Sequence, residues 1–424
     1  MGRGATRRGL LAGLAGLAAG GPATTPGSRA WASAGRDRVG ARLDPWRPGT
    51  LDIHHLSTGR GDATLVVGPD GTTLLIDAGA ASRIDASTLP ARPDASRRAG
   101  EWIGRYVLRR LEETGHSSLD TALITHLHPD HTGGVAEHSP LEPGGRYHLT
   151  GLSDVARQVP IERIIDPDFP DYGYPRFEDA VSAGNYVAFV RARLADGHRV
   201  ERFAVGRADQ ITLVHARSAV PFEVRNLAAR GRVWTGQGDA VRSVFPNRAD
   251  LANSDQPDEN AGSLAIRLSF GSFRYFAAGD LTAWARAGAR PWMDALTPAA
   301  EACGRVSVAV VPHHGLFDGP QGPAIGALAA RAWIISAWHA SHPSPSTLER
   351  LLEERLYPGA RDIYATDLSP AMDLIAGRLT RRLASRAGHV IVRVDQDGQA
   401  FQVVTTAATD EEDLVVSLSS SVNS

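Results

Sequence analysis

Lysine is absent from this chain of 424 residues, and cysteine is almost absent, since Cys303 is the only one. All 45 basic residues are arginine, which we attribute to coding bias. A single thiol cannot form an internal disulfide, so stability must come from a hydrophobic core, and an apolar fraction of 42% is ordinary for a soluble globular protein. The lone cysteine also excludes cysteine-cluster zinc sites, so any metal would be bound by histidine and carboxylate.

Long apolar runs are also missing, so the chain has no candidate membrane helix. Residues 1–34 lack acidic side chains and pass from Arg7 and Arg8 through the small apolar stretch 9–21 to Ala-x-Ala patterns that end at Ala34. This layout is typical of an export signal, and the paired arginines resemble a twin-arginine signal. We therefore expect export to the periplasm or the extracellular space, and the alternative is a disordered start rich in arginine, glycine and alanine.

The charge balance depends on this expected cleavage. The formal net charge is −2, and loss of the four arginines in residues 1–34 leaves 41 basic against 47 acidic residues, a net charge of −6. A mildly acidic protein has no overall electrostatic attraction for nucleic acid or anionic membranes. Nucleic acid stays possible as a partner, because a local arginine groove does not show in a total charge.

The remaining sequence divides into a short linker, one long patterned region and a tail. Residues 35–50 are rich in glycine, arginine and proline, and residues 405–424 form an acidic, serine-rich segment that we expect to be frayed. Residues 51–404 are expected to form the folded domain. Its predicted strands are 51–56, 62–71, 72–79, 119–125, 211–216 and 222–228, and its predicted helices are 100–114 and 186–197.

Metal-binding residue types are concentrated in the stretch ITHLHPDHTGG, residues 124–134, directly after the predicted strand 119–125. His126, His128, Asp130 and His131 fall within six residues. Open α/β folds place their sites where strands leave the sheet. Neutral imidazoles and carboxylates suit Zn²⁺, Fe or Mn²⁺, and two such pairs side by side suit two metals. A polar turn with incidental histidines is the alternative, but the H-x-H-x-D-H spacing is specific.

This motif resembles the signature of the metallo-β-lactamase fold, an α/β (α+β) four-layer αββα sandwich that holds one or two metals between its sheets. Four further segments resemble the branch of that family that includes the DNA-uptake channel ComEC. These segments are the hairpin 59–79, the strand pair 260–281 that ends in Gly-Asp, the turn PHHG within 308–315, and 335–351 with its His-Pro pair. The resemblance spans roughly residues 51 to 400 and implies a single domain.

The resemblance implies roles for individual residues. His126 and His128 would hold the first metal, Asp130 and His131 the second, and Asp280 would bridge both; alternatively, Asp280 could cap a helix over 281–287. One residue of the pair His313 and His314 should complete a metal site while the other contacts substrate, and the sequence leaves open which. We assign His313 as the ligand, and we assign Asp130, His314 and His342 to catalysis.

Other residues are expected to support the site. Asp77 ends a buried strand, where a carboxylate needs hydrogen bonds from the metal loop, and Asp62 is a weaker candidate. Asn260 and Ser263 match a segment that would position substrate. The histidines without a matching motif are expected on the surface: His54, His55, His116, His138, His198 and His215.

One departure from the family pattern concerns the first metal. Many members carry a further histidine in a Gly-His turn between the histidine cluster and the Gly-Asp strand, and this turn is absent here. The first site is therefore expected to have fewer protein ligands, which leaves the number of metals open at one or two. Zn²⁺ is the expected ion, with Mn²⁺ or Fe as alternatives.

These observations predict a metal-dependent hydrolase that attacks a phosphodiester, or another small-molecule substrate, with a metal-activated water. The first alternative is a lactonase or another ester or amide hydrolase of the same fold. A broad basic cleft would favour the phosphodiesterase, and a narrow apolar one the lactonase. The second alternative is a non-catalytic exported binding protein, which predicts damaged ligand motifs.

Overall fold

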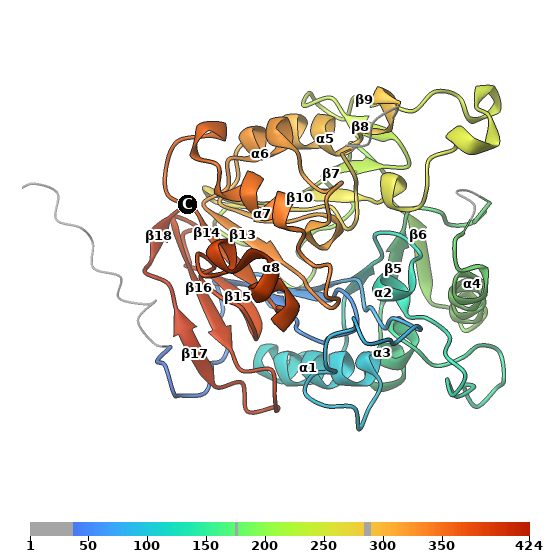
Figure 1. The fold of residues 1–424 in the computed structure, drawn as a ribbon. Coiled ribbons are helices and arrows are strands. Elements are labelled where there is room, and N and C mark those ends of the chain that lie inside the picture. Colours follow the sequence, from blue (N-terminus) through green and yellow to red (C-terminus); the bar gives the residue numbers. More distant parts are fainter. Residues whose placement is uncertain (1–36, 174–176, 284–289) are drawn as a thin grey trace, which may run out of the picture.

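The computed structural model describes residues 37–173, 177–283 and 290–424, and the expected export signal over 1–34 lies outside them. Two β-sheets face each other, with helices on both outer sides (Figure 1). The first sheet has the strand order β17-β16-β15-β1-β2-β3-β4-β5-β6, and β18 also pairs with β16. Its strands are β1 Leu51–His55, β2 Thr64–Val67, β3 Thr73–Ile76, β4 Thr121–Leu123, β5 Arg163–Asp166, β6 Arg199–Arg202, β15 His389–Val394, β16 Ala400–Thr406, β17 Val415–Leu418 and β18 Val422–Asn423.

The second sheet has the order β14-β13-β12-β11-β10-β7-β8-β9. Strands β11 to β14 run parallel to one another, as do β3 to β6 in the first sheet, whereas the hairpins β1-β2-β3 and β10-β11 are antiparallel. The strands are β7 Phe222–Ala229, β8 Arg232–Trp234, β9 Val241–Ser243, β10 Ala265–Phe270, β11 Phe273–Ala277, β12 Val308–Val310, β13 Ala332–Ile335 and β14 Asp362–Ala365.

Helices cover the outer face of each sheet. Apolar residues of α1, α3 and α4 pack on the first sheet, and those of α5, α6, α7 and α8 pack on the second. Figure 1 shows α5 and α6 at the top of the view and α1 and α3 at the bottom, with the strands between them. The helices are α1 Ala99–Thr114, α2 Pro129–Thr132, α3 Leu152–Gln158, α4 Ala180–Ala195, α5 Leu296–Cys303, α6 Gly322–Leu328, α7 Pro345–Leu352 and α8 Pro370–Thr380. The predicted four-layer αββα sandwich is confirmed.

Strand alternation explains how the layers form. In β1, Leu51 and Ile53 join the core between the sheets, where they meet Leu268 and Tyr275 of the second sheet. In β2, Leu65 faces the opposite way and joins the core under the helices. Because both faces of each sheet are covered, apolar side chains are buried on both sides of the strands, which is why the strands are short apolar runs. Within the described ranges, no helix has the length and apolarity needed to cross a bilayer.

The expectation of surface positions for His54 and His55 is wrong, because both histidines are fully buried. The outward-facing side of β1 is covered by α1, so His54 Nδ1 lies 3.0 Å from the hydroxyl oxygen of Tyr106. His55 lies on the inner side, where its ring is 5.7 Å from that of Tyr275, centroid to centroid. The surface expectation rested on the lack of a matching motif, and only the tertiary structure shows that a helix covers His54 and that the second sheet covers His55.

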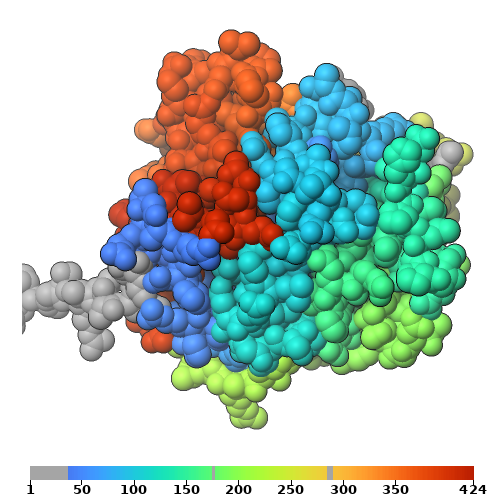
Figure 2. Space-filling view, turned by 90° about the horizontal axis from the view of Figure 1, so that it is seen from below, coloured from blue at the N-terminus to red at the C-terminus, as the bar shows by residue number. Residues whose placement is uncertain are grey.

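The C-terminal segment 405–424 is not frayed as expected. Strands β17 and β18 both pair with β16, and Val415 is buried. Its acidic residues face the arginines of α1, where Asp413 Oδ2 lies 3.0 Å from the Arg110 guanidinium and Glu411 pairs with Arg105. Figure 2 shows the red end of the chain lying against blue and cyan residues. The acidic residues suggested a solvated tail, but they are instead paired with these arginines.

Residues 37–50, expected as a linker, lie against the same sheet. Leu43 and Trp46 are buried, and Arg42 forms a β-bridge with Leu414. The predicted strand 211–216 is wrong, because this segment forms no ladder. Its backbone N–H groups at Val214 and His215 donate instead to the side chains of Thr72 and Asp70.

Candidate metal centre

The candidate metal ligands follow the carboxyl ends of parallel strands in both sheets. Asp77 follows β3, residues 126–131 follow β4, Asp280 follows β11, and His313 and His314 follow β12. Side chains from the two facing sheets can therefore converge at one edge of the sandwich, where open α/β folds bind ligands. The strand order brings together residues that are more than 180 positions apart in sequence, such as Asp130 and His314.

Close backbone packing holds the loop after β4. The Asp130 carbonyl accepts the N–H of Asp62 at 2.9 Å and lies so close to Gly79 that a Cβ there would be 1.9 Å away. The chain leaves the loop at Gly133, whose φ of +106° favours glycine. Gly79 and Gly133 therefore permit the close approach that fixes the loop after β4 against the first hairpin.

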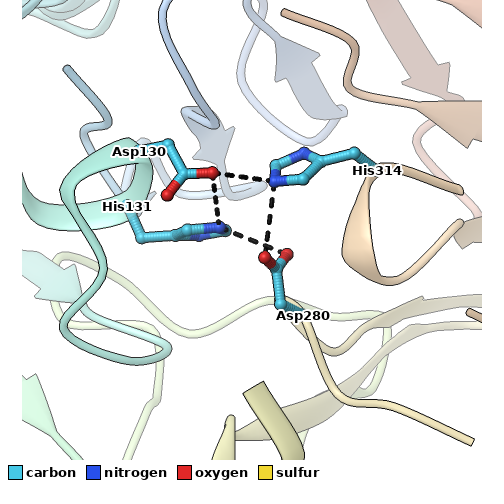
Figure 3. A group of neighbouring side chains, drawn as sticks. All are labelled: Asp130, His131, Asp280 and His314. Carbon is cyan, nitrogen blue, oxygen red and sulfur yellow. Dashed lines mark hydrogen bonds and ion pairs between the residues drawn. The ribbon is translucent and has the colours of Figure 1, made fainter. Parts of the chain in front are cut away.

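Four of the side chains form one group, Asp130, His131, Asp280 and His314 (Figure 3). His314 Nε2 lies 3.0 Å from Asp130 Oδ2 and 3.4 Å from Asp280 Oδ2. His131 Nε2 lies 3.2 Å from Asp280 Oδ1 and 3.7 Å from Asp130 Oδ2. One ligand atom from each residue lies within 4.8 Å of all the others, which is compact enough for a single ion.

His126, His128 and Asp280 form a second group that meets the same distance limit. His126 Nε2 lies 3.9 Å from Asp280 Oδ2, and the His126 ring lies 4.6 Å from that of His128 and 4.2 Å from that of His131, centroid to centroid. Asp280 belongs to both groups, as expected for a bridging carboxylate. Its alternative as the cap of a helix over 281–287 falls partly on residues that are not described.

The pair His313 and His314 is arranged in the opposite way to our assignment. His314 belongs to the four-residue group, whereas His313 stands at its edge, with Nε2 3.9 Å from Asp280 Oδ2. His313 Nδ1 lies 2.8 Å from Asp318 Oδ1, and its Nε2 lies 3.2 Å from the side-chain nitrogen of Asn260. Both histidines have φ near +50°, which turns consecutive side chains in different directions.

Asp77 supports His131 as expected. Its Oδ2 lies 2.8 Å from His131 Nδ1, and the same carboxylate accepts the backbone N–H and the hydroxyl of Thr125. When Nδ1–H donates to Asp77, the lone pair of Nε2 faces the group. At His314 the hydrogen bond of Nδ1 is to the carbonyl oxygen of Ser336 at 3.0 Å, and Asp62 Oδ1 lies 3.1 Å from Nδ1 without forming a hydrogen bond.

His342 lies beside the four-residue group rather than in it. Its ring stacks on that of His314 with centroids 4.5 Å apart and planes 12° apart. Sequence reasoning missed Trp338, whose Nε1–H donates to Asp130 Oδ2 at 3.1 Å. It also missed Glu259, which lies 3.3 Å from His128 Nε2. Trp338 lies in the segment 335–351 and Glu259 directly precedes Asn260, but the motifs assign no role to either position.

Charge complementarity is the dominant electrostatic feature of the group. Burial alone would lower the pKa of His131 and of His314, but the surrounding carboxylates outweigh it and raise both pKa values well above the ordinary range. Burial would raise the pKa of Asp280, but His131 and His314 outweigh it and lower that pKa. His126 lacks such compensation, and burial together with the other histidines lowers its pKa.

Unpartnered buried atoms indicate that these residues fit a metal. His126 Nε2 is buried and has no hydrogen-bond partner, and the buried atoms His131 Nε2 and Asp280 Oδ1 face each other at 3.2 Å without forming a hydrogen bond. Leaving buried polar atoms unpaired costs free energy, which a bound cation would offset. Two imidazole nitrogens and a shared carboxylate on one side, and two imidazoles and two carboxylates on the other, are donor sets for divalent transition metals.

One cavity is lined by residues of the two groups, and a second cavity adjoins it. The first, of about 260 Å³, is lined by His128, Asp130 and Trp338 together with one arginine, Arg83, and the acidic Glu178 and Asp179. The second, of about 210 Å³, shares Ala81 and Ser82 with the first and is lined by Arg60, Arg92, Arg97 and Arg98. The cavity at the ligand groups is therefore neither uniformly basic nor narrow and apolar. The arginine-lined cavity lies beside it.

Comparison with solved structures finds distant likenesses. A mutant of CmlA beta-hydroxylase is 13% identical with a TM-score of 0.36, and CmlA, a diiron beta-hydroxylase from Streptomyces venezuelae, is 14% identical with a TM-score of 0.35. Each alignment covers 83% of this chain and 55% of CmlA, so this chain spans about half the length of that protein. Human tRNase Z, short form, is 11% identical with a TM-score of 0.28 over 66% of this chain and 91% of its own.

Comparison with curated protein sequences finds no match. Residues 56–139 match the family model of the Metallo-beta-lactamase superfamily. This segment runs from the end of β1 to beyond α2 and contains His126, His128, Asp130 and His131. Over this segment, about a fifth of its length, the chain is therefore similar to the metallo-beta-lactamase superfamily, whose members are generally metal-dependent hydrolases.

Proposed function

We propose that this protein is a hydrolase of phosphodiesters that depends on two divalent cations. The observation that carries the proposal is the position of Asp280, which belongs to both ligand groups. A carboxylate shared by two groups is the arrangement that two-metal hydrolases use to hold their ions close together. Apart from the absent Gly-His turn, the motif residues that could hold metal are all present, which argues against a non-catalytic binding protein.

His131, His314, Asp130 and Asp280 would hold one cation, and His126, His128 and Asp280 the other. Bound cations would supply an activated water and would stabilise the negative charge that develops on the scissile group. Asp130 is held in place by His314 Nε2 and by Trp338 Nε1–H, which fixes the carboxylate that faces the first cavity. Asp77 orients the imidazole of His131, and the carbonyl oxygen of Ser336 orients that of His314.

His313 is the best-placed proton donor for the leaving group. Its Nδ1 faces the Asp318 carboxylate, and burial, which lowers its pKa, is outweighed by Asp280 and Asp318, which raise it. With Nδ1–H donated to Asp318, Nε2 accepts from the Asn260 amide nitrogen, so this imidazole can deliver a proton from Nε2, as general acids do, once the amide turns its oxygen toward the ring. This exchanges the roles first assigned to His313 and His314, while His342 stacks behind His314 and supports its orientation.

The second cavity supports an anionic substrate. Arg60 donates to the carbonyl oxygens of Gly59 and Leu89, and the Arg97 guanidinium lies over the ring of Trp102. Arg92 and Arg98 are paired with Asp367 and Asp154. Guanidinium groups bind phosphate oxygens well, so a phosphodiester that extends from the metal group into this cavity would find positive charge there. A neutral lactone would gain no comparable attraction from this positive charge.

We also propose that the protein is exported and that it belongs to the ComEC-like branch. The pattern of residues 1–34 supports export by a twin-arginine signal, and the motifs over 59–79, 260–281 and 308–315 support the ComEC-like branch. Zn²⁺ is the first candidate ion, with Mn²⁺ and Fe as alternatives.

The proposal is tested by metal content and hydrolysis measured on the same samples. Wild type and Asp130→Ala are analysed by mass spectrometry for metals and assayed with bis-p-nitrophenyl phosphate and with a lactone. We expect two equivalents of metal and phosphodiester hydrolysis in wild type, and loss of metal and activity in the variant. Wild type that stays metal-free and inactive after addition of Zn²⁺ or Mn²⁺ would contradict the proposal. Activity on the lactone alone would favour the lactonase.

A second variant tests the anionic substrate. Arg97→Ala removes positive charge from the second cavity without touching the metal group, so the KM for a phosphodiester should rise several-fold while kcat changes little. The KM of a neutral ester, if one is hydrolysed, should stay the same. An equal change in both KM values would indicate a structural effect.

A further inference from the structure

Two glutamates approach the same nitrogen of His128. Glu259 Oε2 lies 3.3 Å from His128 Nε2, and Glu178 Oε2 lies 3.6 Å from it. They differ in burial, because the side chain of Glu259 is 1% exposed and that of Glu178 is 85% exposed. An exposed carboxylate near a histidine needs no further explanation, but a buried one does.

The Glu259 carboxylate is incompletely paired. Its Oε2 accepts the backbone N–H of Glu178 at 2.8 Å, but its Oε1 is buried and has no hydrogen-bond partner. The guanidinium of Arg230 does not neutralise it, since that group pairs with the carboxylate of Asp168 and reaches Glu259 only through the backbone carbonyl, at 3.4 Å. A buried carboxylate oxygen without a partner is costly unless a cation binds it.

The position of Glu259 in the chain matches the departure noted in the sequence. The Gly-His turn expected between His131 and Asp280 is absent, which leaves the first group with two histidines and the shared Asp280. Glu259 lies between His131 and Asp280 in sequence, in the loop between β9 and β10. It contacts His128, the residue of the first group that lines the first cavity. It therefore places a buried carboxylate beside His128, at the rim of the compact set formed by His126, His128 and Asp280.

We propose that Glu259 is a ligand of the first metal, together with His126, His128 and the shared Asp280. The first site then presents two imidazoles and two carboxylates rather than three imidazoles and one carboxylate. Carboxylates suit Mn²⁺ and imidazoles suit Zn²⁺, and a site with two histidines and a carboxylate is typical of Fe²⁺. Relative to a three-histidine site, this site is less selective for Zn²⁺. The inference rests on the metal binding proposed above but not on phosphodiester hydrolysis.

The test compares metal binding in four full-length proteins: wild type, Glu259→Gln, Glu259→His and Glu178→Gln. Each is stripped with chelator and titrated with Mn²⁺ and with Zn²⁺ under buffered free-metal conditions, and bound metal is counted by mass spectrometry. Glu259→Gln keeps the acceptor for the Glu178 N–H but removes the charge. Glu178→Gln is the matched control, because it changes the other carboxylate near the same nitrogen.

Wild type and Glu178→Gln are expected to bind two equivalents. Glu259→Gln should bind one equivalent as tightly as wild type and the other at least about 100-fold more weakly, since even outer partners of metal ligands are worth 10- to 100-fold. Glu259→His should recover the second equivalent, with the ratio of Zn²⁺ to Mn²⁺ affinity raised about tenfold or more over wild type. These are metal counts and affinities, so they do not depend on activity.

Other results overturn the inference. Two equivalents of unchanged affinity in Glu259→Gln would exclude the ligand role while leaving the proposed function intact, and loss in Glu178→Gln alone would assign the role to the exposed residue. Wild type that binds no metal would remove both proposals. If circular dichroism shows that Glu259→Gln does not fold, Glu259→His decides: two equivalents with raised Zn²⁺ selectivity support the inference, and one equivalent overturns it.

Discussion

Two groups of buried histidines in this protein differ in their neighbours rather than in their burial. The metal-centre group is His126, His131 and His314, and the second histidine group is His54, His55 and His389. In each group every side chain is almost fully inaccessible to solvent. The first group faces carboxylates, whereas the second faces the Tyr106 hydroxyl, the Thr64 hydroxyl and the backbone N–H of Ser57. The Asp52 carboxylate lies 4.0 Å from His54 Nε2, but it is paired with Arg393.

The neighbours decide the protonation of the two groups. Burial lowers the pKa of His55 to about 3 and that of His389 to about 4, and burial together with Arg110 and Arg393 lowers the pKa of His54. In the metal-centre group, carboxylates reverse this effect at His131 and His314. A site whose negative charge stabilises protonated histidines also stabilises metal cations, which displace the protons on binding. Buried histidines therefore indicate a metal site only where unpaired carboxylates face them.

The largest expected difference follows from removing the shared carboxylate. Asp280→Asn should lose both metals and all phosphodiester hydrolysis, because Asp280 contributes to both ligand groups. His54→Asn, in the second histidine group, should keep two equivalents of metal. Mass spectrometry for metals on both variants is the measurement. Full metal content in Asp280→Asn would show that carboxylates are not the reason why the metal-centre group binds metal and the second histidine group does not.

A smaller effect is expected in the pH dependence of stability. The pKa of His389 is about 4 in the folded protein against an ordinary value of 6.5, so below pH 6.5 the unfolded chain binds a proton that the folded protein does not. Stability is thus full above pH 6.5 and falls as the pH drops toward 4, by roughly 3 kcal/mol for this residue.

His389→Asn tests this contribution, because the Asn side-chain oxygen can accept the Ser57 N–H in place of Nδ1. Urea unfolding of both proteins between pH 4 and 7, with chelator present, gives the free energy of unfolding. The variant should lose less stability than wild type over this range. Parallel curves would mean that His389 is protonated in the folded state.

The smallest effect concerns the carboxylate behind His131. In Asp77→Asn the side-chain amide would donate to His131 Nδ1 and favour the tautomer that carries its proton on Nε2, away from the lone pair that a metal needs. Metal affinity should fall about 10- to 100-fold. Asp120→Asn is the control, since Asp120 binds Thr73 at the other end of the same strands and should affect stability but not metal affinity. Equal metal affinity in both variants would contradict the orienting role of Asp77.

Much of the metal centre could be predicted because its ligands are local in sequence. The H-x-H-x-D-H spacing places four donors in one loop, and a strand that ends in such a loop presents them at the sheet edge. Asp77 was predicted for the same reason, because a carboxylate at the end of a buried strand needs partners. The first hairpin followed from short apolar runs separated by turn residues, whereas the two facing sheets were implied by the family resemblance.

The remaining features depend on contacts between distant segments, and sequence patterns carry little information about these. Whether His313 or His314 faces Asp130 is decided by backbone turns between the sheets, and Glu259 meets His128 only because the loop before β10 folds over the first sheet. The acidic residues 410–413 and the histidines of β1 have polar sequences, but α1 covers them and supplies arginines and a tyrosine as partners. By itself, then, the sequence determined which residue types could bind metal and where the strands run, because these are local properties. The tertiary structure decided which of these side chains meet, because burial and charge pairing arise only when the two sheets and their helices pack together.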